Sequence, residues 1–154
     1  MKIQFDFDPE EETGITIPRA KRDEATKRVA DFVRESVLSA VGEGRSPVAG
    51  EGRFQALSKE YKKRKSEISS STIPNLELYG DMLDSLEVVE VRGGKLRLKV
   101  GEDQNDKADG HCNFSGKSKI PRRRFVPNAK DGQTFSRDII SGIKDILSEY
   151  EEEA

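Results

Sequence analysis

The feature that most constrains the fold is a run of apolar residues, from Ala25 to Val41, that recur at three- and four-residue steps. This spacing places them along one face of an α-helix. Pro18, a residue type favoured at the first helical position, precedes the run, and Gly42 and Gly44 follow it. The sequence therefore predicts a helix of about 24 residues, with one face that must be buried against other elements.

Two other regions alternate between apolar and polar residues, which is the period of a β-strand with one buried face. Residues 3–7 predict a short N-terminal strand, and an acidic turn follows it within segment 1–17. Residues 89–91 and 96–100 flank the pair Gly93-Gly94. Because glycine accepts the positive φ of a primed turn, the two runs predict a β-hairpin.

The C-terminal part predicts a second amphipathic helix from Phe135 to Tyr150, capped by Thr134 and followed by a frayed acidic tail over residues 148–154.

The middle of the chain predicts shorter elements. A short basic helix is expected from Ser58 through Lys65, and another over residues 76–86, weakened by Gly80. The glycine-rich stretch 42–52 reads as a loop. Residues 101–119 are nearly free of apolar side chains and predict a long functional or partner-ordered loop.

These elements predict an α+β fold in which a small, mostly antiparallel sheet with a hairpin packs against two long amphipathic helices. We interpret residues 1–154 as one domain, because a chain of 154 residues suits a single core. Only 33% of the residues are hydrophobic and 36% are charged. The core is therefore expected to be small, with long polar loops whose order depends on neighbouring molecules.

Charge and cysteine content narrow the function classes. The 27 basic and 29 acidic residues nearly cancel, so no overall field attracts nucleic acid or an anionic membrane. The single cysteine, Cys112, excludes an internal disulfide and fits a reducing compartment. No apolar run approaches the roughly 18–20 residues of a membrane span, and the N-terminus lacks a secretory apolar core. We expect a soluble protein made inside the cell.

The sequence offers little for catalysis. His111 and Cys112, with Asp106 and Asp109 nearby, form the only cluster that resembles a metal or nucleophile site, and it has too few ligands for zinc. The carboxylates lie in surface runs, and the glycine pairs lack the lysine-serine ending of a phosphate loop. We predict no enzymatic activity, no cofactor and no metal; an enzyme using His111 and Cys112 is the minor alternative.

Segment 120–126 carries three arginines between a proline and two apolar residues, a combination suited to docking on a protein surface. In an extended strip the side chains alternate, so Arg123 is expected to face one way and Arg122 and Arg124 the other. We expect Arg123 and Phe125 to be replaceable without loss of the fold. The predicted docking residues are His111, Phe114, Arg122, Arg123, Arg124 and Phe125.

A second basic patch consists of Lys62, Lys63, Arg64 and Lys65. Together with the arginine strip it could hold a phosphate backbone, with an affinity that falls as salt is added. Interleaved aromatic residues for base stacking are scarce, and the net charge is −2. A nucleic-acid-binding accessory protein is therefore the alternative to a docking protein.

Taken in chain order, several short motifs resemble the phage virion morphogenesis or tail-completion family over about residues 18–147. After the first helix come a glycine-rich loop with an aromatic and a Leu-Ser pair, then a leucine and glycine motif, an Ala-x-x-His element, and Ile-Pro-x-Arg-x-Phe. The matching positions are Gly50 to Phe54, Leu57, Ser58, Tyr61, Lys65, Leu78, Gly80, Leu83, Ser85, Leu86, Ala108, His111, Gly116, Ile120, Pro121, Arg123 and Phe125. Lys107, Arg122 and Arg124 depart from the family pattern.

The resemblance implies a non-enzymatic structural protein of a tailed-phage virion, located at the tail or neck and assembled in the host cytoplasm. It implies a ring of identical subunits, six by expectation, that joins the tail tube or tail terminator to the head-tail connector, with DNA passing through the lumen. Region 101–126 would dock on the adjacent subunit or on the component below. Acidic residues would face the DNA channel, where like charge keeps phosphates from binding.

Overall fold

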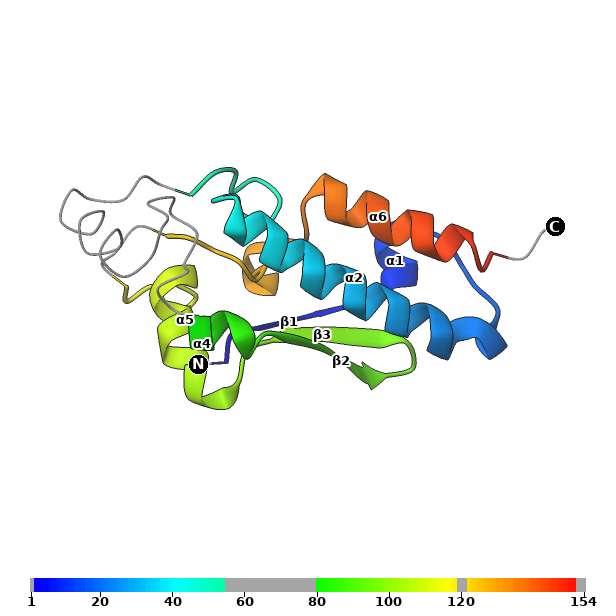
Figure 1. Ribbon diagram of the computed structural model, residues 1–154, viewed down its shortest axis with the longest axis horizontal. Coiled ribbons are helices and arrows are strands. Elements are labelled where there is room, and N and C mark those ends of the chain that lie inside the picture. The colour runs from blue at the N-terminus through cyan, green and yellow to red at the C-terminus, as the bar shows by residue number, and fades with distance from the viewer. Residues whose placement is uncertain (1, 55–79, 119–121, 152–154) are drawn as a thin grey trace.

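The computed structural model describes residues 2–54, 80–118 and 122–151. It contains helices and a three-stranded antiparallel sheet, so the prediction of an α+β fold is confirmed. Helices α2 (Arg22–Gly42) and α6 (Arg137–Ser148) lie side by side over one face of the sheet (Figure 1). The predicted basic helix and the patch at residues 62–65 lie outside the described residues.

The sheet has the strand order β1-β3-β2, and both of its ladders are antiparallel. Strand β1 (Gln4–Phe7) pairs with β3 (Lys95–Lys99), which also pairs with β2 (Glu87–Arg92). The predicted N-terminal strand and hairpin are therefore confirmed. Gly93 and Gly94 have φ values of 52° and 90°, the left-handed conformation that a type I′ turn needs at both positions. A Cβ on Gly94 would also lie 2.8 Å from the Cδ of Arg22.

One face of the sheet is apolar and covered, and the other is charged. Phe5 pairs with Leu98 and Phe7 with Leu96, and all four side chains belong to the core beneath the helices. On the opposite face, the charges of neighbouring strands alternate in sign and form two ion pairs, Asp6 with Arg97 and Glu87 with Lys99. Such a division is typical of antiparallel sheets with one solvated side.

Helix α2 confirms the main prediction from the sequence. A single turn of 3₁₀ helix, η1 (Arg19–Lys21), follows Pro18 and leads directly into α2. The α2 residues that share the predicted stripe are buried: Ala25, Val29, Val33, Val37, Ala40 and Val41. In α6, Ile139, Ile143 and Leu147 are buried at the same helical spacing. The two stripes and the apolar sheet face form the core.

The N-terminal acidic segment is a helix, not the expected turn. Helix α1 (Pro9–Thr13) begins after Asp8, whose side chain accepts a hydrogen bond of 3.0 Å from the Glu10 N–H, and it ends at Gly14 with φ 73°. The glutamates of its first turn face the positive end of the helix dipole, which explains why an acidic segment is helical. Short capped helices of this kind have too few apolar residues for periodicity to reveal them.

Segment 101–119 is also not the long loop that the sequence predicted. The turn η3 (Glu102–Gln104) leads into α5 (Asn105–Cys112), a two-turn helix. Only a narrow stripe of it is buried, namely Ala108, His111 and Cys112. One alanine, one histidine and one cysteine do not make a recognisable apolar pattern, so the prediction of a loop was wrong for this part.

One smaller expectation was also wrong. Thr134 does not cap α6, because its hydroxyl donates to the Glu12 carboxylate at 3.0 Å, and Ser136 occupies the cap position instead. Of the helix expected over residues 76–86, the structure describes α4 (Gly80–Asp84), and residues 76–79 lie outside the described part of the chain. The loop predicted at 42–52 is confirmed and carries isolated bridges, including Val48 with Phe135.

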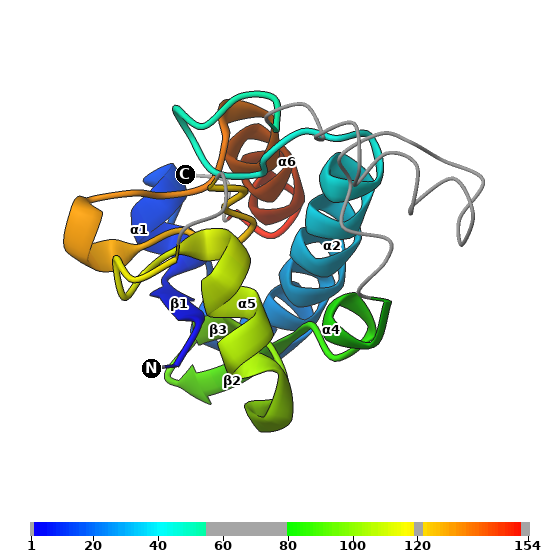
Figure 2. The ribbon, with the colours of Figure 1, turned by 90° about the vertical axis from the view of Figure 1, so that its left-hand side faces the viewer.

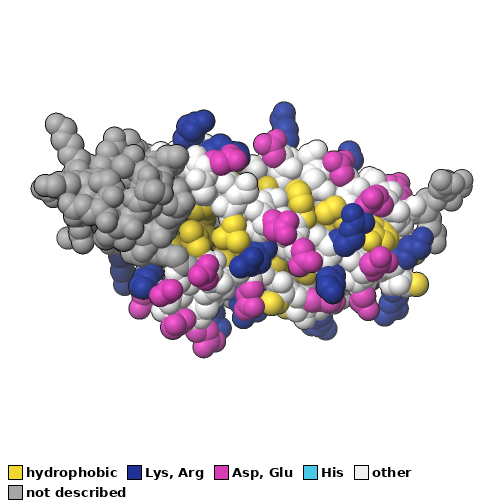
Figure 3. Space-filling view, viewed as in Figure 1, with side chains coloured by type: hydrophobic (Ala, Val, Ile, Leu, Met, Phe, Trp, Pro, Cys, Tyr) yellow, Lys and Arg dark blue, Asp and Glu magenta, His cyan; other side chains and the backbone are white. Residues whose placement is uncertain are grey.

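The surface formed by α2 and α6 carries both signs of charge, mixed along the helices, with hydrophobic side chains visible between them (Figure 3). Seen end-on, α5 lies across the end of the sheet, and the yellow and orange segment after it runs back beside β1 (Figure 2). This segment contains the arginine strip and a 3₁₀ turn, η4 (Ala129–Asp131). Among the described residues, no helix combines the length and the apolar character that crossing a bilayer requires.

Candidate docking site at the arginine strip

The described part of the arginine strip, residues 122–126, runs from the surface into the interior. Arg122 is exposed and forms a two-pronged ion pair with Glu51, with nitrogen to oxygen distances of 2.8 and 2.9 Å. Beyond it the chain is covered, since Arg123 is 7% exposed, Arg124 2%, and Phe125 and Val126 0%. Only the first arginine of the three is at the surface.

Arg124 holds the C-terminal end of α5. Its guanidinium donates hydrogen bonds of 2.8–3.2 Å to the carbonyl oxygens of Cys112 and Asn113 and to the side chains of Asp131 and Gln133. It also lies over the Phe114 ring, 5.0 Å from the centroid. The last carbonyls of a helix have no partner within the helix and carry partial negative charge, so a buried cation is stabilised there.

The expected alternation of the arginines is therefore wrong. Arg122 is exposed and Arg124 is buried, although both were expected on the same side. The backbone N–H of Arg123 donates to the His111 carbonyl at 2.8 Å, and the Ser46 hydroxyl donates to the Arg124 carbonyl. These contacts with α5 and the 45–54 loop decide where each side chain goes.

Burial also changes the list of candidate docking residues. Phe125 has no exposed surface, and Arg123, Arg124 and His111 are nearly covered, so in the subunit these four side chains contribute to the interior. Burial changes the expectation for replacing Arg123 and Phe125, because truncating a buried Phe costs about 3–5 kcal/mol and would destabilise the fold. Of the six predicted docking residues, Arg122 is exposed and Phe114 is half-buried.

His111 and Cys112 are held in unreactive forms. Burial, and to a smaller extent the positive charge of Arg123, lowers the pKa of His111 to about 4, so the imidazole is neutral near pH 7. Burial raises the pKa of the Cys112 thiol to about 12. A nucleophilic cysteine needs a lowered pKa and access to substrate, and Cys112 has neither in this fold. No group of three or more potential ligands that could hold a metal ion occurs among the described residues.

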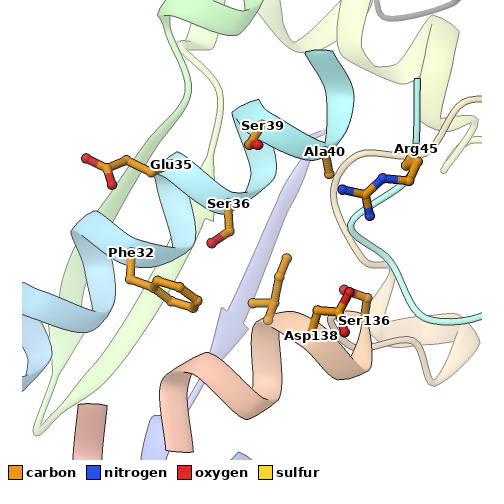
Figure 4. A pocket seen from close by; sticks show the side chains of 9 residues that line it. Phe32, Glu35, Ser36, Ser39, Ala40, Arg45, Ser136 and Asp138 are labelled. Carbon is orange, nitrogen blue, oxygen red and sulfur yellow. The ribbon is translucent and has the colours of Figure 1, made fainter. Parts of the chain in front are cut away.

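The sequence did not reveal an open groove of about 380 Å³ between α2 and α6 (Figure 4). Glu35 and Asp138 lie on its two sides, and Arg45 at one end is paired with Glu43. The remaining lining residues are small, polar or apolar: Phe32, Ser36, Ser39, Ala40, Ser136 and Ile139. The sequence signal for this groove was the pair of small polar residues Ser36 and Ser39 on the longest helix. Helical periodicity alone places them on a solvent-exposed face and does not indicate a groove.

Gly142 sets the close approach of the two helices beside this groove. A Cβ at position 142 would lie 2.1 Å from the Cζ of Phe32, so the ring packs on the bare backbone of α6.

The nucleic-acid alternative is weakened, because two of the arginines on which it depends, Arg123 and Arg124, are covered, and Arg122 is already paired with Glu51. Its other patch, residues 62–65, lies outside the described part of the chain.

Comparison of this chain with protein-family models, with curated proteins and with solved structures finds no match.

Proposed function

We propose that this protein is a structural subunit of a tailed-phage virion, a tail-completion or neck component. Six copies assemble as a ring at the head-tail junction or the upper tail end, with the tail tube or tail terminator on one side and the head-tail connector on the other. The subunit performs no bond-making chemistry. DNA passes through the lumen of the ring.

The observation that carries this proposal is the meeting of two motifs that are separate in the sequence. The Ala-x-x-His element ends α5, and the Pro-x-Arg-x-Phe strip is bound to that same helix end. The backbone N–H of Arg123 donates to the His111 carbonyl at 2.8 Å, and Ala108 and Phe125 are fully buried. The residues that carry the family resemblance thus form one structural unit, as expected of positions that maintain a shared fold.

The leucine, glycine and serine motif gives similar support. Gly80 begins α4, and the Ser85 hydroxyl just after this helix accepts a hydrogen bond of 3.0 Å from the Gly101 N–H. Leu86 is 1% exposed in the core. A Cβ on Gly101 would lie 3.2 Å from the Cβ of Ser85, so the small residues join α4 closely to the segment before α5. These motif residues therefore connect the hairpin to the unit described above.

The proposal is tested by the assembly state of the purified protein, alone and mixed with the tail-tube and connector proteins of the same phage. Native mass spectrometry and negative-stain images are expected to yield a closed ring of six subunits. A strict monomer at every concentration, bound by neither neighbour, would contradict the proposal.

The docking surface is tested separately with Arg122→Ala, because this side chain is exposed and its loss leaves the core intact. We expect weaker binding to the neighbouring component. Lys144→Ala is the matched control, since it removes the same charge from an exposed position on α6, outside region 101–126. Equal binding by the two variants would remove Arg122 from the docking surface.

A further inference from the structure

Strand β2 forms a free edge of the sheet. It pairs with β3 on one side, and among the described residues its backbone makes no hydrogen bond on the other side. Figure 1 shows it along the lower border of the sheet. The opposite edge differs, because β1 is bordered by the chain's own segment 128–130 (Figure 2). A free edge presents unpaired N–H and C=O groups in a row, and an extended segment of another molecule can pair with them.

A hollow of about 250 Å³ lies between this edge and α2. Contacts close it at both ends. At one end the Arg34 guanidinium donates to the Leu86 carbonyl at 2.8 Å, and at the other end the Arg22 side chain packs against the hairpin turn. Between these contacts the helix presents Thr26 and Ala30 to the strand. Both side chains are short, so space remains beside β2 for side chains of a partner.

The hollow is acidic. Its charged lining consists of Asp23, Lys27 and Asp31 from the helix and Glu90 from the strand, so three carboxylates share the hollow with one ammonium group. All four side chains are exposed, and none forms an ion pair in the described part of the chain. Carboxylates gathered in a hollow attract a cationic side chain and repel phosphate groups, so this surface suits a basic protein segment and not nucleic acid.

The register of the sheet decides which side chains of an added strand would enter the hollow. Val88 and Glu90 lie opposite leucines of β3 on the face that the helices cover, and both line the hollow. Glu87 and Val89 lie on the other face. An added strand alternates in the same way, so every second side chain would enter the hollow and those between would lie beside Val89. A bulge after Glu90 ends the regular ladder and confines this pairing to the start of β2.

We propose that the β2 edge binds an extended segment of another protein in which Lys or Arg alternates with β-branched or other apolar residues. The backbone of this segment adds a strand to the sheet, its cations enter the acidic hollow, and its apolar side chains pack beside Val89. Val91, which is 43% exposed, lies directly beyond the paired residues and offers a further apolar contact. This surface lies apart from the arginine strip, and the inference does not depend on the proposed ring.

The charges of the edge argue against a second copy of β2 as the occupant. Pairing two β2 strands would bring two acidic hollows together, along with the glutamates at positions 87 and 90 of both strands. Like charges placed across an interface disfavour the association. A basic segment replaces this repulsion with attraction, because its cations approach carboxylates that have no ion pair within the described chain.

Peptide binding to the full-length protein tests the proposal. A labelled synthetic peptide in which lysine and valine alternate is expected to raise its fluorescence anisotropy on titration with the protein, with an affinity that falls as salt is added. A peptide of the same composition, with its lysines and valines in separate blocks, should bind many-fold more weakly. The absence of binding by the alternating peptide, or equal affinity for the two peptides, would overturn the proposal.

Variants of the protein locate the bound peptide. Asp31→Asn and Glu90→Gln are each expected to lower the affinity several-fold, and Ala30→Leu should lower it further by filling the hollow, with the fold of each variant checked by circular dichroism. Glu35→Gln is the matched control, because it removes an exposed carboxylate of α2 that lines the groove shared with α6. A larger loss with Glu35→Gln than with Asp31→Asn would place the peptide in that groove and overturn the proposal.

Methylation of the peptide amides tests strand pairing. Alternate N–H groups of an added strand point toward β2, so N-methylation of the lysine amides or of the valine amides, but not of both sets, should abolish binding. Equal affinity of the two methylated peptides would refute the added strand. A dimer of the protein that the alternating peptide dissociates would show that a second copy occupies the edge, and it would overturn the assignment of a basic partner.

Discussion

Replacing Arg124 with alanine tests whether this arginine serves the interior of the subunit. The side chain is 2% exposed and donates to two carbonyl oxygens at the end of α5, which would lose their donor. Each buried acceptor left without a partner costs about 1–3 kcal/mol. Loss of the cation-π contact with Phe114 adds about 0.5–2 kcal/mol. Asp131 is 51% exposed and returns to water, so it adds little.

The expected loss in the free energy of unfolding is therefore about 2.5–8 kcal/mol, a large part of the roughly 5–15 kcal/mol typical of a folded domain. The midpoint of thermal unfolding should fall by at least about 5 °C. Urea unfolding followed by circular dichroism measures the free energy directly. Arg124→Lys should retain part of the stability, because an ammonium group can reach only some of the acceptors that the guanidinium fork spans.

Arg122→Ala is the matched control, because it removes the neighbouring arginine and an ion pair that is exposed on the arginine side. Surface pairs contribute about 0–1 kcal/mol, so this variant should unfold close to the wild type. If Arg124→Ala also unfolded within about 1 kcal/mol of the wild type, the guanidinium would not be holding the helix end. The reasoning from its hydrogen bonds would then be refuted.

Three further predictions concern buried groups. Burial holds the pKa of His111 in the folded protein at about 4, against about 6.5 for an exposed histidine, so the unfolded chain binds its proton first as pH falls. The free energy of unfolding should therefore drop by about 3 kcal/mol between roughly pH 6.5 and 4. His111→Gln should flatten the urea midpoints across that window; an unchanged pH dependence would contradict the assignment. Cys112 should react with a thiol reagent only after unfolding, given its burial and its pKa of about 12, and rapid labelling of the native protein would contradict its burial. Gly142→Ala should destabilise, because the new Cβ meets Phe32 at 2.1 Å and overpacking costs about 1–3 kcal/mol, whereas Gly110→Ala in an open position of α5 should stabilise by up to about 1 kcal/mol; the same sign for both would refute the close approach.

The burial of two of the three arginines in the strip shows why the candidate site was only partly predictable from the sequence. Three successive arginines read as a surface patch because charged residues are rarely buried without partners. The partners of Arg124 are backbone carbonyls at 112 and 113 and side chains at 131 and 133, brought together only when α5 forms against the strip. No local pattern in the sequence indicates such a set of partners, so the sequence did not predict which of the arginines would be buried.

The same reasoning separates the elements that were predicted from those that were missed. Helix α2, helix α6, the N-terminal strand and the Gly93-Gly94 hairpin follow from spacings of 3.6 or 2 residues and from glycine's freedom at positive φ, all of which are local properties. Helix α1 rests on a cap and α5 on a three-residue stripe, and both are too short for periodicity to detect.

The sequence by itself thus determined the α+β architecture, because a long apolar stripe and two alternating runs can be buried together in few ways. The tertiary structure alone decided which polar groups are interior and which charged side chains share a surface hollow. Those properties depend on segments far apart in the chain: Lys2 and Lys130 line one hollow, and Asp23 and Glu90 line another. The spacing of apolar side chains is a property of residues close together in the sequence, whereas surface shape and charge arise only when distant segments meet.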